Sequence, residues 1–94
     1  MQIKWLRRAL NDLESIADYI ALDNPAAALS ILDTIEAITD GLSDHPERGR
    51  GGRVSGTREL VIPGTAYISV YRIKTERIEV LRVLHSAQQW PPIE

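Results

Sequence analysis

Apolar and polar positions alternate through much of the second half of the chain. Runs rich in β-branched and aromatic residues predict three strands there, at 58–62, 66–73 and 77–85. Two short connections separate the runs, Pro63–Thr65 and Lys74–Glu76. Connections of this length join antiparallel neighbours, because parallel strands need a long crossover. We therefore expect an antiparallel meander.

The first half of the chain opens with a short alternating segment and continues with helical spacing. Gln2–Trp5 predicts an edge strand, with Ile3 and Trp5 facing the core. Residues 7–22 then predict a helix with one apolar stripe, formed by Leu10, Leu13, Ile16, Ala17 and Ile20. Leu6 stands where a capping Ser, Thr or Asp is expected, so the sequence defines the start of this helix only loosely.

A second helix is predicted from about Pro25 to Leu42. Asn24 is a good N-cap, and Pro25 suits the first helical position. The apolar stripe consists of Ala28, Ile31, Leu32, Ile35, Ile38 and Leu42. The link to the first helix is very short, so the two helices should form an antiparallel hairpin.

The predicted order is β-α-α-β-β-β, a two-layer α+β fold with the helical hairpin on one face of the sheet. The first strand can pair with the last or the middle strand of the meander. The glycine- and arginine-rich segment 47–56 matches no phosphate-loop spacing, so we expect a turn leading to a short strand at 52–54. We expect the 94 residues to form a single domain, residues 1–94.

Composition limits the cofactors and the cellular location that we expect for the protein. The chain has no cysteine, and neither of its two histidines has metal-ligand spacing around it, so the sequence gives no reason to expect a metal or cofactor. Its longest uncharged run, 60–71, is too short for a membrane span, and its N-terminus lacks an apolar signal core. We expect a cytoplasmic protein that does not bind membranes.

Charge divides the chain into two halves. Residues 1–46 carry three basic and eight acidic side chains, a net charge of −5. Residues 47–94 carry eight basic and five acidic side chains, a net charge of +3. This division favours a polar helix layer and a basic sheet face, or a solvated surface with scattered arginines.

Several short motifs, taken in order, resemble the RelE/ParE superfamily of type II toxin–antitoxin toxins, and within it the ParE-like branch. The motifs are Trp5 with Ala9, Asp12-Leu13, Ile16 and Tyr19-Ile20; Asn24-Pro25-Ala26-Ala27; His45-Pro46 with Gly49-Arg50; Gly56-Thr57-Arg58-Glu59-Leu60; Tyr67 to Arg72; Arg82-Val83-Leu84-His85; and Gln88-Gln89-Trp90-Pro91. The resemblance covers almost the whole chain.

The resemblance implies a toxin neutralised by a cognate antitoxin in a hetero-oligomer, with operator DNA contacted only through the antitoxin. Members of the superfamily act by two routes. RelE-like toxins are ribosome-dependent endoribonucleases that cleave mRNA, whereas ParE-like toxins are non-enzymatic poisons of DNA gyrase. A degenerate module that only binds antitoxin is a third alternative.

RNA cleavage through the 2′-hydroxyl needs a base, an acid and positive charge at the phosphate. The candidates are Arg58 and Arg82 as phosphate ligands, His85 as acid or base, and Tyr67 or Tyr71 as a stacking platform. Strand alternation places Tyr67, Ser69 and Tyr71 on one face and Arg72 on the other. It also separates Arg82 from His85 if the strand is regular.

Each candidate also has a structural interpretation. The tyrosines are typical sheet-packing residues, the arginines typical ion-pair members, and a histidine at a strand end is often hydrogen-bonded. Trp90 beside Pro91-Pro92 predicts a staple against the core or an exposed contact anchor.

Three features favour the gyrase poison. The net charge is −2, which suits an RNA ligand poorly. The C-terminal part lacks the cluster of lysines and arginines with a late tyrosine that RelE-like nucleases carry, and the ending from Leu84 to Pro91 resembles ParE-like toxins. We therefore expect a non-enzymatic inhibitor of gyrase whose target-binding residues are Arg58, Tyr67, Tyr71, Arg82, His85 and Trp90. If the protein is an enzyme, we expect a metal-independent endoribonuclease with His85, Arg58, Arg82 and Tyr71 as catalytic residues.

Overall fold

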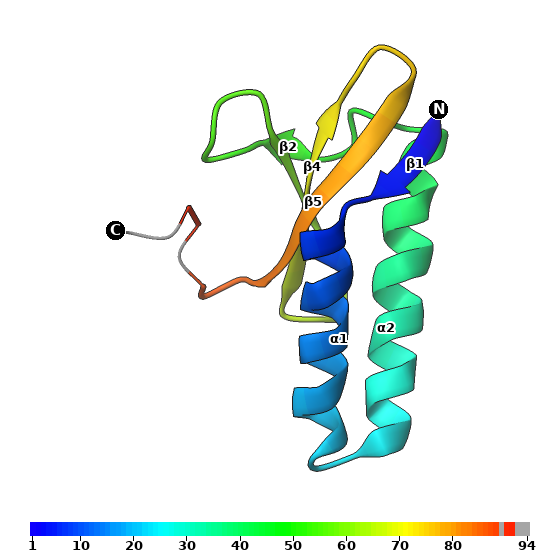
Figure 1. Cartoon of the computed structure of the whole chain (residues 1–94), viewed down its shortest axis with the longest axis vertical. Coiled ribbons are helices and arrows are strands. Elements are labelled where there is room, and N and C mark those ends of the chain that lie inside the picture. Colours follow the sequence, from blue (N-terminus) through cyan, green and yellow to red (C-terminus); the bar gives the residue numbers. More distant parts are fainter. Residues whose placement is uncertain (89, 92–94) are drawn as a thin grey trace.

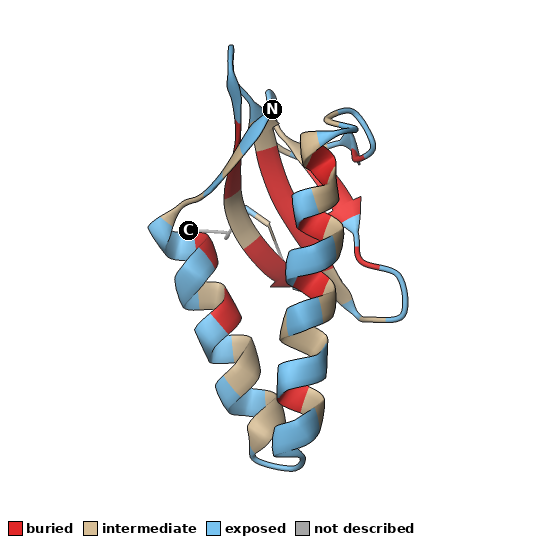
Figure 2. Cartoon of the chain, turned by 90° about the vertical axis from the view of Figure 1, so that its right-hand side faces the viewer, coloured by how far each residue is buried: buried red, intermediate tan, exposed pale blue. Residues whose placement is uncertain are grey.

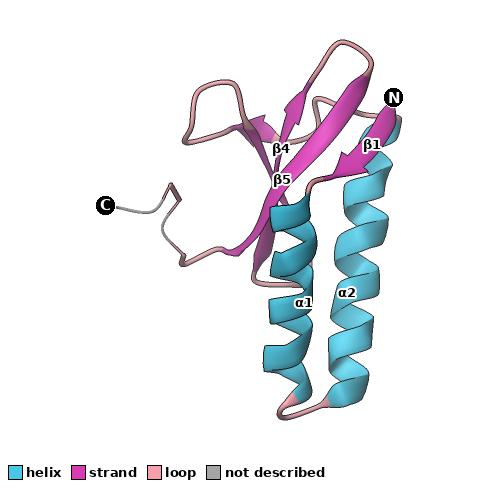
Figure 3. Cartoon of the chain, in the orientation of Figure 1, coloured by secondary structure: helices cyan, strands magenta, loops and turns pink. Residues whose placement is uncertain are grey.

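The computed structural model describes residues 1–88 and 90–91. Gln89 of the ending motif and Pro92 beside Trp90 lie outside the described residues. The elements, in chain order, are β1 (Gln2–Trp5), α1 (Arg7–Ala21), α2 (Pro25–Asp40), the 3-10 helix η1 (Gly41–Ser43), β2 (Arg50–Gly51), β3 (Arg58–Val61), β4 (Tyr67–Ile73) and β5 (Arg77–His85). Figures 1 and 3 show the long helical hairpin beside the sheet.

The five strands form one sheet in the order β1-β5-β4-β3-β2. The predicted meander is confirmed, since β3, β4 and β5 pair antiparallel. The first strand pairs with the last, in parallel, with Gln2 opposite Arg77 and Trp5 opposite Val80. The hairpin of α1 and α2 is the long connection that lies between β1 and the meander.

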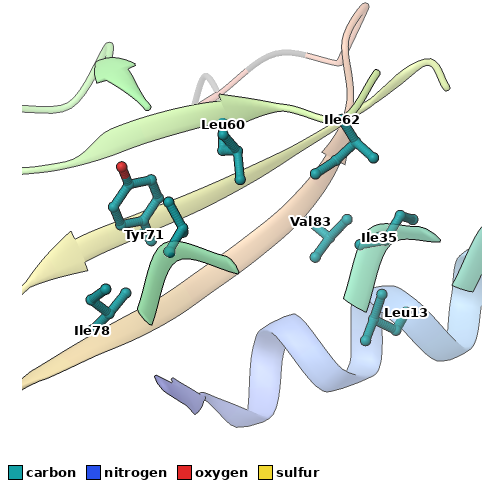
Figure 4. Close-up of a cluster of buried hydrophobic side chains, with 8 residues drawn as sticks. Leu13, Ile35, Leu60, Ile62, Tyr71, Ile78 and Val83 are labelled. Atoms are coloured by element: carbon teal, nitrogen blue, oxygen red, sulfur yellow. The ribbon is translucent and has the colours of Figure 1, made fainter. Parts of the chain in front are cut away.

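The helices cover one face of this sheet and bury an apolar core against it. The core cluster comprises Leu13, Ile35, Leu42, Leu60, Ile62, Tyr71, Ile78 and Val83, most of which Figure 4 labels. Every predicted stripe residue of α2 is at least partly buried. Figure 2 shows buried residues along the central strands, whereas much of the helical surface is exposed.

Two sequence predictions about local structure are wrong. Leu10 was expected in the core stripe of α1 but is 51% exposed, while Ala9 and Leu13 are buried. Leu10 lies at the margin of the stripe, because it is about 100° around the helix axis from the buried Ala9. The short strand expected at 52–54 is instead β2 at Arg50–Gly51, because residues 52–57 form a turn closed by the bond from Gly52 N to Thr57 O (2.8 Å).

The two helices differ in how their N-termini are capped. The Asn24 side chain accepts a hydrogen bond from Ala27 N (3.1 Å), as expected of an N-cap, and Pro25 begins α2. Leu6 supplies no side-chain cap to α1. Across the described part of the chain, neither helix combines the length and apolar character that crossing a membrane requires.

The other face of the sheet carries no helix, and we call it the helix-free face. Strand alternation and register place Lys4, Glu79 and Arg72 side by side on it, and likewise Arg82, Val70, Glu59 and Arg50. Tyr67, Ser69 and Tyr71 share one face, as predicted, and it is the face that the helices cover, where Ser69 Oγ lies 2.8 Å from Thr39 Oγ1 of α2. The expected basic face is therefore the face without helices.

Candidate functional site

Tyr71 is a buried structural anchor in the middle of the sheet. Its side chain is fully buried, and its hydroxyl donates to Pro46 O (2.7 Å) and accepts from Gly49 N (2.9 Å). A Cβ at Gly49 would stand 2.7 Å from the tyrosine hydroxyl, so only glycine fits at this position. Burial raises the pKa of Tyr71. Tyr71 therefore fixes the loop between η1 and β2.

Arg58 fixes the same loop from the neighbouring strand. It is the register partner of Tyr71, and its guanidinium donates to Gly49 O (2.7 Å) and Glu47 O (3.4 Å). Arg58 does not pair with the adjacent Glu59, whose carboxylate is bound by Arg50 and Arg53. The structure thus brings Arg58 and Tyr71 together at one end of β4.

Arg82 forms a structural ion pair, as one of the two sequence interpretations proposed. Its guanidinium donates to both oxygens of Asp12 in α1 (2.8 and 3.2 Å), and Asp12 also accepts from Val83 N (2.9 Å). The side chain of Arg82 is only 11% exposed, and its guanidinium carbon lies 5.6 Å from the ring centroid of Trp90. The half-buried Trp90 therefore covers this ion pair.

Tyr67 and His85 meet at the opposite end of β4. They are register partners, and their rings are 5.6 Å apart in an edge-to-face arrangement. His85 is exposed, and its Nδ1 accepts from Ala87 N (3.1 Å). With Tyr19, Ser15 and Gln88 the pair lines a groove of about 520 Å³ between α1 and β5.

The candidate residues therefore form two groups, and Asp12, the ion-pair partner of Arg82, lines the same groove as Tyr67 and His85. Tyr67 and Tyr71 are four residues apart on β4, which corresponds to roughly 13 Å along a strand. By register Arg82 and His85 lie on opposite faces of the sheet, and the guanidinium of Arg82 reaches Asp12 of α1. The arrangement does not bring an acid, a base and two phosphate ligands into one cluster.

Sequence reasoning missed the two carboxylates that organise the helix-free face. Glu59 is 2% exposed. Its carboxylate accepts hydrogen bonds from Arg53 N (2.9 Å), Nε (3.1 Å) and Nη2 (3.2 Å), and from Arg50 Nη2 (3.5 Å). Glu79 is 4% exposed and accepts from Arg72 Nε (2.7 Å) and Arg77 Nε (2.9 Å). A glutamate inside a strand with arginines nearby was the available signal.

Both glutamates are held in their charged form. Burial raises the pKa of Glu59, but hydrogen bonds and charge from Arg53, with a smaller contribution from Arg50, outweigh it and leave the pKa below its usual range. Hydrogen bonds from Arg72 and Arg77 lower the pKa of Glu79. Each carboxylate thus remains an anion that holds two guanidinium groups. Among residues 1–88 and 90–91, no three side chains of metal-ligating type gather in one place.

The fold, a helical hairpin on a five-stranded mixed sheet, is that of the RelE/ParE superfamily toxins. Residues 3–90 match the family described as ParE toxin of type II toxin–antitoxin system, parDE, and the chain belongs to this family. It is therefore a toxin of a type II toxin–antitoxin system, as the sequence motifs indicated.

Relatives with curated descriptions span the same length. The chain is 42% identical to Y4kP of Sinorhizobium fredii over 92 residues, covering 98% of this chain and 95% of that protein. It is 32% identical to toxin RelE2 of Caulobacter vibrioides over 87 residues, covering 93% and 97%. One of these relatives is thus named a RelE toxin, whereas the matching family is that of the ParE toxins.

Solved structures of toxin–antitoxin systems contain chains with the same fold. The chromosomal ParDE system of P. aeruginosa contains a chain that superposes with a TM-score of 0.84 at 31% identity, covering 90% of this chain and 95% of that one. A chain of the toxin–antitoxin complex RelBE2 of Mycobacterium tuberculosis superposes with a TM-score of 0.61 at 26% identity, covering 89% and 95%.

Proposed function

We propose that this toxin acts by stoichiometric binding to DNA gyrase, and that a cognate antitoxin neutralises it by binding the toxin. The separation of the candidate residues carries the first part of the proposal. A nuclease needs its acid, base and phosphate ligands around one phosphate. Here Arg58 and Tyr71 hold a loop at one end of β4, Arg82 is bound by Asp12, and His85 stands at the other end.

The family membership supports the same proposal, because the matching family is the ParE toxin family. The antitoxin is proposed from the structural neighbours, whose descriptions name a ParDE system and a RelBE2 complex. In this proposal Tyr67, His85 and Trp90 contact the target, while Arg58, Tyr71 and Arg82 hold the contact surface in shape.

The exposed pair of His85 and Tyr67 beside a groove favours one alternative, a ribosome-dependent endoribonuclease. In that case His85 moves the proton and Tyr67 stacks on a base. The phosphate would need arginines other than Arg82, because the guanidinium of Arg82 is bound to Asp12.

Toxin freed from its antitoxin distinguishes these proposals in two parallel assays. One assay measures supercoiling and DNA cleavage by gyrase, and the other measures mRNA cleavage in a translating extract. We expect gyrase inhibition with intact mRNA. Cut mRNA with unaffected gyrase would contradict the gyrase proposal.

The variant His85→Gln provides a second test that distinguishes the gyrase inhibitor from the endoribonuclease. A proton-transferring histidine contributes roughly 10²- to 10⁴-fold to a rate, so the variant would lose RNA cleavage. If His85 is only a contact residue of a gyrase inhibitor, replacing it should weaken gyrase inhibition by about tenfold or less. Circular dichroism of the variant establishes that it is folded.

A further inference from the structure

The helix-free face carries positive charge that the proposed contact residues do not use. Five cationic side chains lie on it, Lys4, Arg50, Arg53, Arg72 and Arg77, together with the two glutamates Glu59 and Glu79. We call this set the arginine face. Its net charge is +3, whereas that of the whole chain is −2.

The helix layer has the opposite charge. Between Arg8 and Arg48 the sequence contains no lysine or arginine, and it contains eight acidic residues up to Asp44. A molecule with this charge distribution orients in the field of a polyanion, with the arginine face turned toward the polyanion.

The guanidinium groups of the arginine face are held in place and remain accessible. The side chains of Arg50, Arg53, Arg72 and Arg77 are 64%, 43%, 41% and 49% exposed. A guanidinium group has five N–H donors, and Arg72 donates only its Nε to Glu79. The buried carboxylates therefore reduce the side-chain entropy lost on binding, while donors remain for a second partner.

The geometry fits the phosphates of a nucleic acid. Glu59 and Glu79 lie two strands apart and two residues apart along the sheet, which corresponds to about 12 Å. Successive phosphates on one DNA strand rise by about 3.4 Å, so the two arginine pairs span several phosphates of one strand. Arginine pairs well with phosphate oxygens, and such contacts position a protein without reading sequence.

We infer that the arginine face binds the phosphodiester backbone of the DNA held by the target enzyme, so that the toxin contacts protein and DNA together. This inference rests on the proposed function, because gyrase supplies both the protein surface and the bound duplex. The contact is sequence-independent, since no base-reading element is involved.

The test variant is Arg50→Gln with Arg77→Gln. It removes one arginine from each pair and leaves each glutamate with one partner, Arg53 or Arg72, so no buried charge is stranded. The matched control is Arg7→Gln with Arg8→Gln, which removes the same charge from exposed positions at the start of α1.

The first measurement is binding of the whole toxin to gyrase with and without a 40-base-pair duplex. We expect the duplex to tighten binding of the wild type and the control. In the test variant this gain should fall about tenfold, and the slope of log affinity against log salt should drop by about 2. Equal gains in the test variant and the control would overturn the inference.

A second measurement separates this inference from the gyrase proposal. Fluorescence anisotropy with the labelled duplex alone, and with a single-stranded RNA of 40 nucleotides, is recorded at low salt. If gyrase is not bound at all, preferential duplex binding that is lost in the test variant still supports the arginine face. Preferential RNA binding overturns the assignment to DNA, and no binding to either overturns the inference.

Discussion

The helix-covered face and the helix-free face belong to the same strands but differ in how much charge they bury. The helices cover the first with apolar side chains such as Ile35 of α2 and Leu42 of η1, both fully buried. The second buries apolar side chains such as Val70 and Leu84, and it also buries Glu59 and Glu79 under arginines. The aliphatic stems of arginines can cover a sheet while their charged ends remain in water.

This difference separates two sources of stability. Apolar burial depends little on pH or salt, whereas pairing of a carboxylate with exposed arginines depends on both. Apolar burial on both faces thus holds the fold together. The helix-free face keeps charge in fixed positions at a modest cost in free energy, which is useful for binding.

The largest effect is expected on the covered face. Ile35→Ala should lower the free energy of unfolding by about 3 kcal/mol, because it leaves a cavity where the helix packs on the sheet. Urea unfolding measures this, with Leu29→Ala on the exposed side of the same helix as the control. Equal losses in both variants would mean that the two sides of α2 are not distinguished by packing.

The next effect concerns the polar anchor within that face. Tyr71→Phe should cost about 2 kcal/mol, because Gly49 N and Pro46 O lose their hydrogen-bond partner. Tyr19→Phe, at a side chain that is 73% exposed, is the control. Amide hydrogen exchange of Gly49 should accelerate in the Tyr71 variant, and unchanged exchange would contradict this role.

On the helix-free face the expected loss is smaller and depends on pH. Glu59→Gln should cost about 1 kcal/mol at pH 7, since the arginines that bind Glu59 are partly exposed. The pKa of Glu59 is lowered in the folded state from its ordinary value of 4.5, so the wild type has this contribution above that pH.

As the pH falls from 4.5 through the lower folded pKa of Glu59, the wild type loses the contribution. The variant has no carboxylate at position 59, so the two proteins should converge in acid. Urea unfolding at several pH values measures this. A constant difference between wild type and variant across the acid range is the result that would contradict it.

The smallest effect is expected at Leu10, which the apolar pattern assigned to the core. The side chain is 51% exposed, so Leu10→Gln should change stability by no more than about 0.5 kcal/mol. Thermal unfolding compares it with Leu13→Gln, which places an amide in the core. Comparable losses of stability in the two variants would mean that Leu10 does pack in the core.

The sequence was sufficient for the elements and the meander because their signals are local, but it left open whether β1 pairs with β4 or β5. Periodicity of 2 in β4 and β5 and of 3.6 in α2, with Asn24 and Pro25 at a helix start, each depend on neighbours in the chain. Alternation also predicted that Tyr67 and Tyr71 share a face and that Arg82 and His85 do not.

The candidate site was less predictable because its contacts join distant segments. Asp12 and Arg82 are 70 residues apart, and nothing near Arg82 indicates which carboxylate it meets. Glu59 takes Arg53 rather than Arg58 because the 52–57 turn folds back over β3. The position of β2 was missed for the same reason.

The parallel pairing of β1 with β5 joins the first segment of the chain to the last. During synthesis, β1 and both helices emerge long before residues 77–85. Until β5 is complete, β1 has no strand beside it, α1 lacks its main partner in the sheet, and Asp12 lacks Arg82. Contacts of such long sequence separation slow folding. We therefore expect the toxin to reach its active shape only after its last strand has left the ribosome, so that a truncated chain is harmless to the cell that makes it.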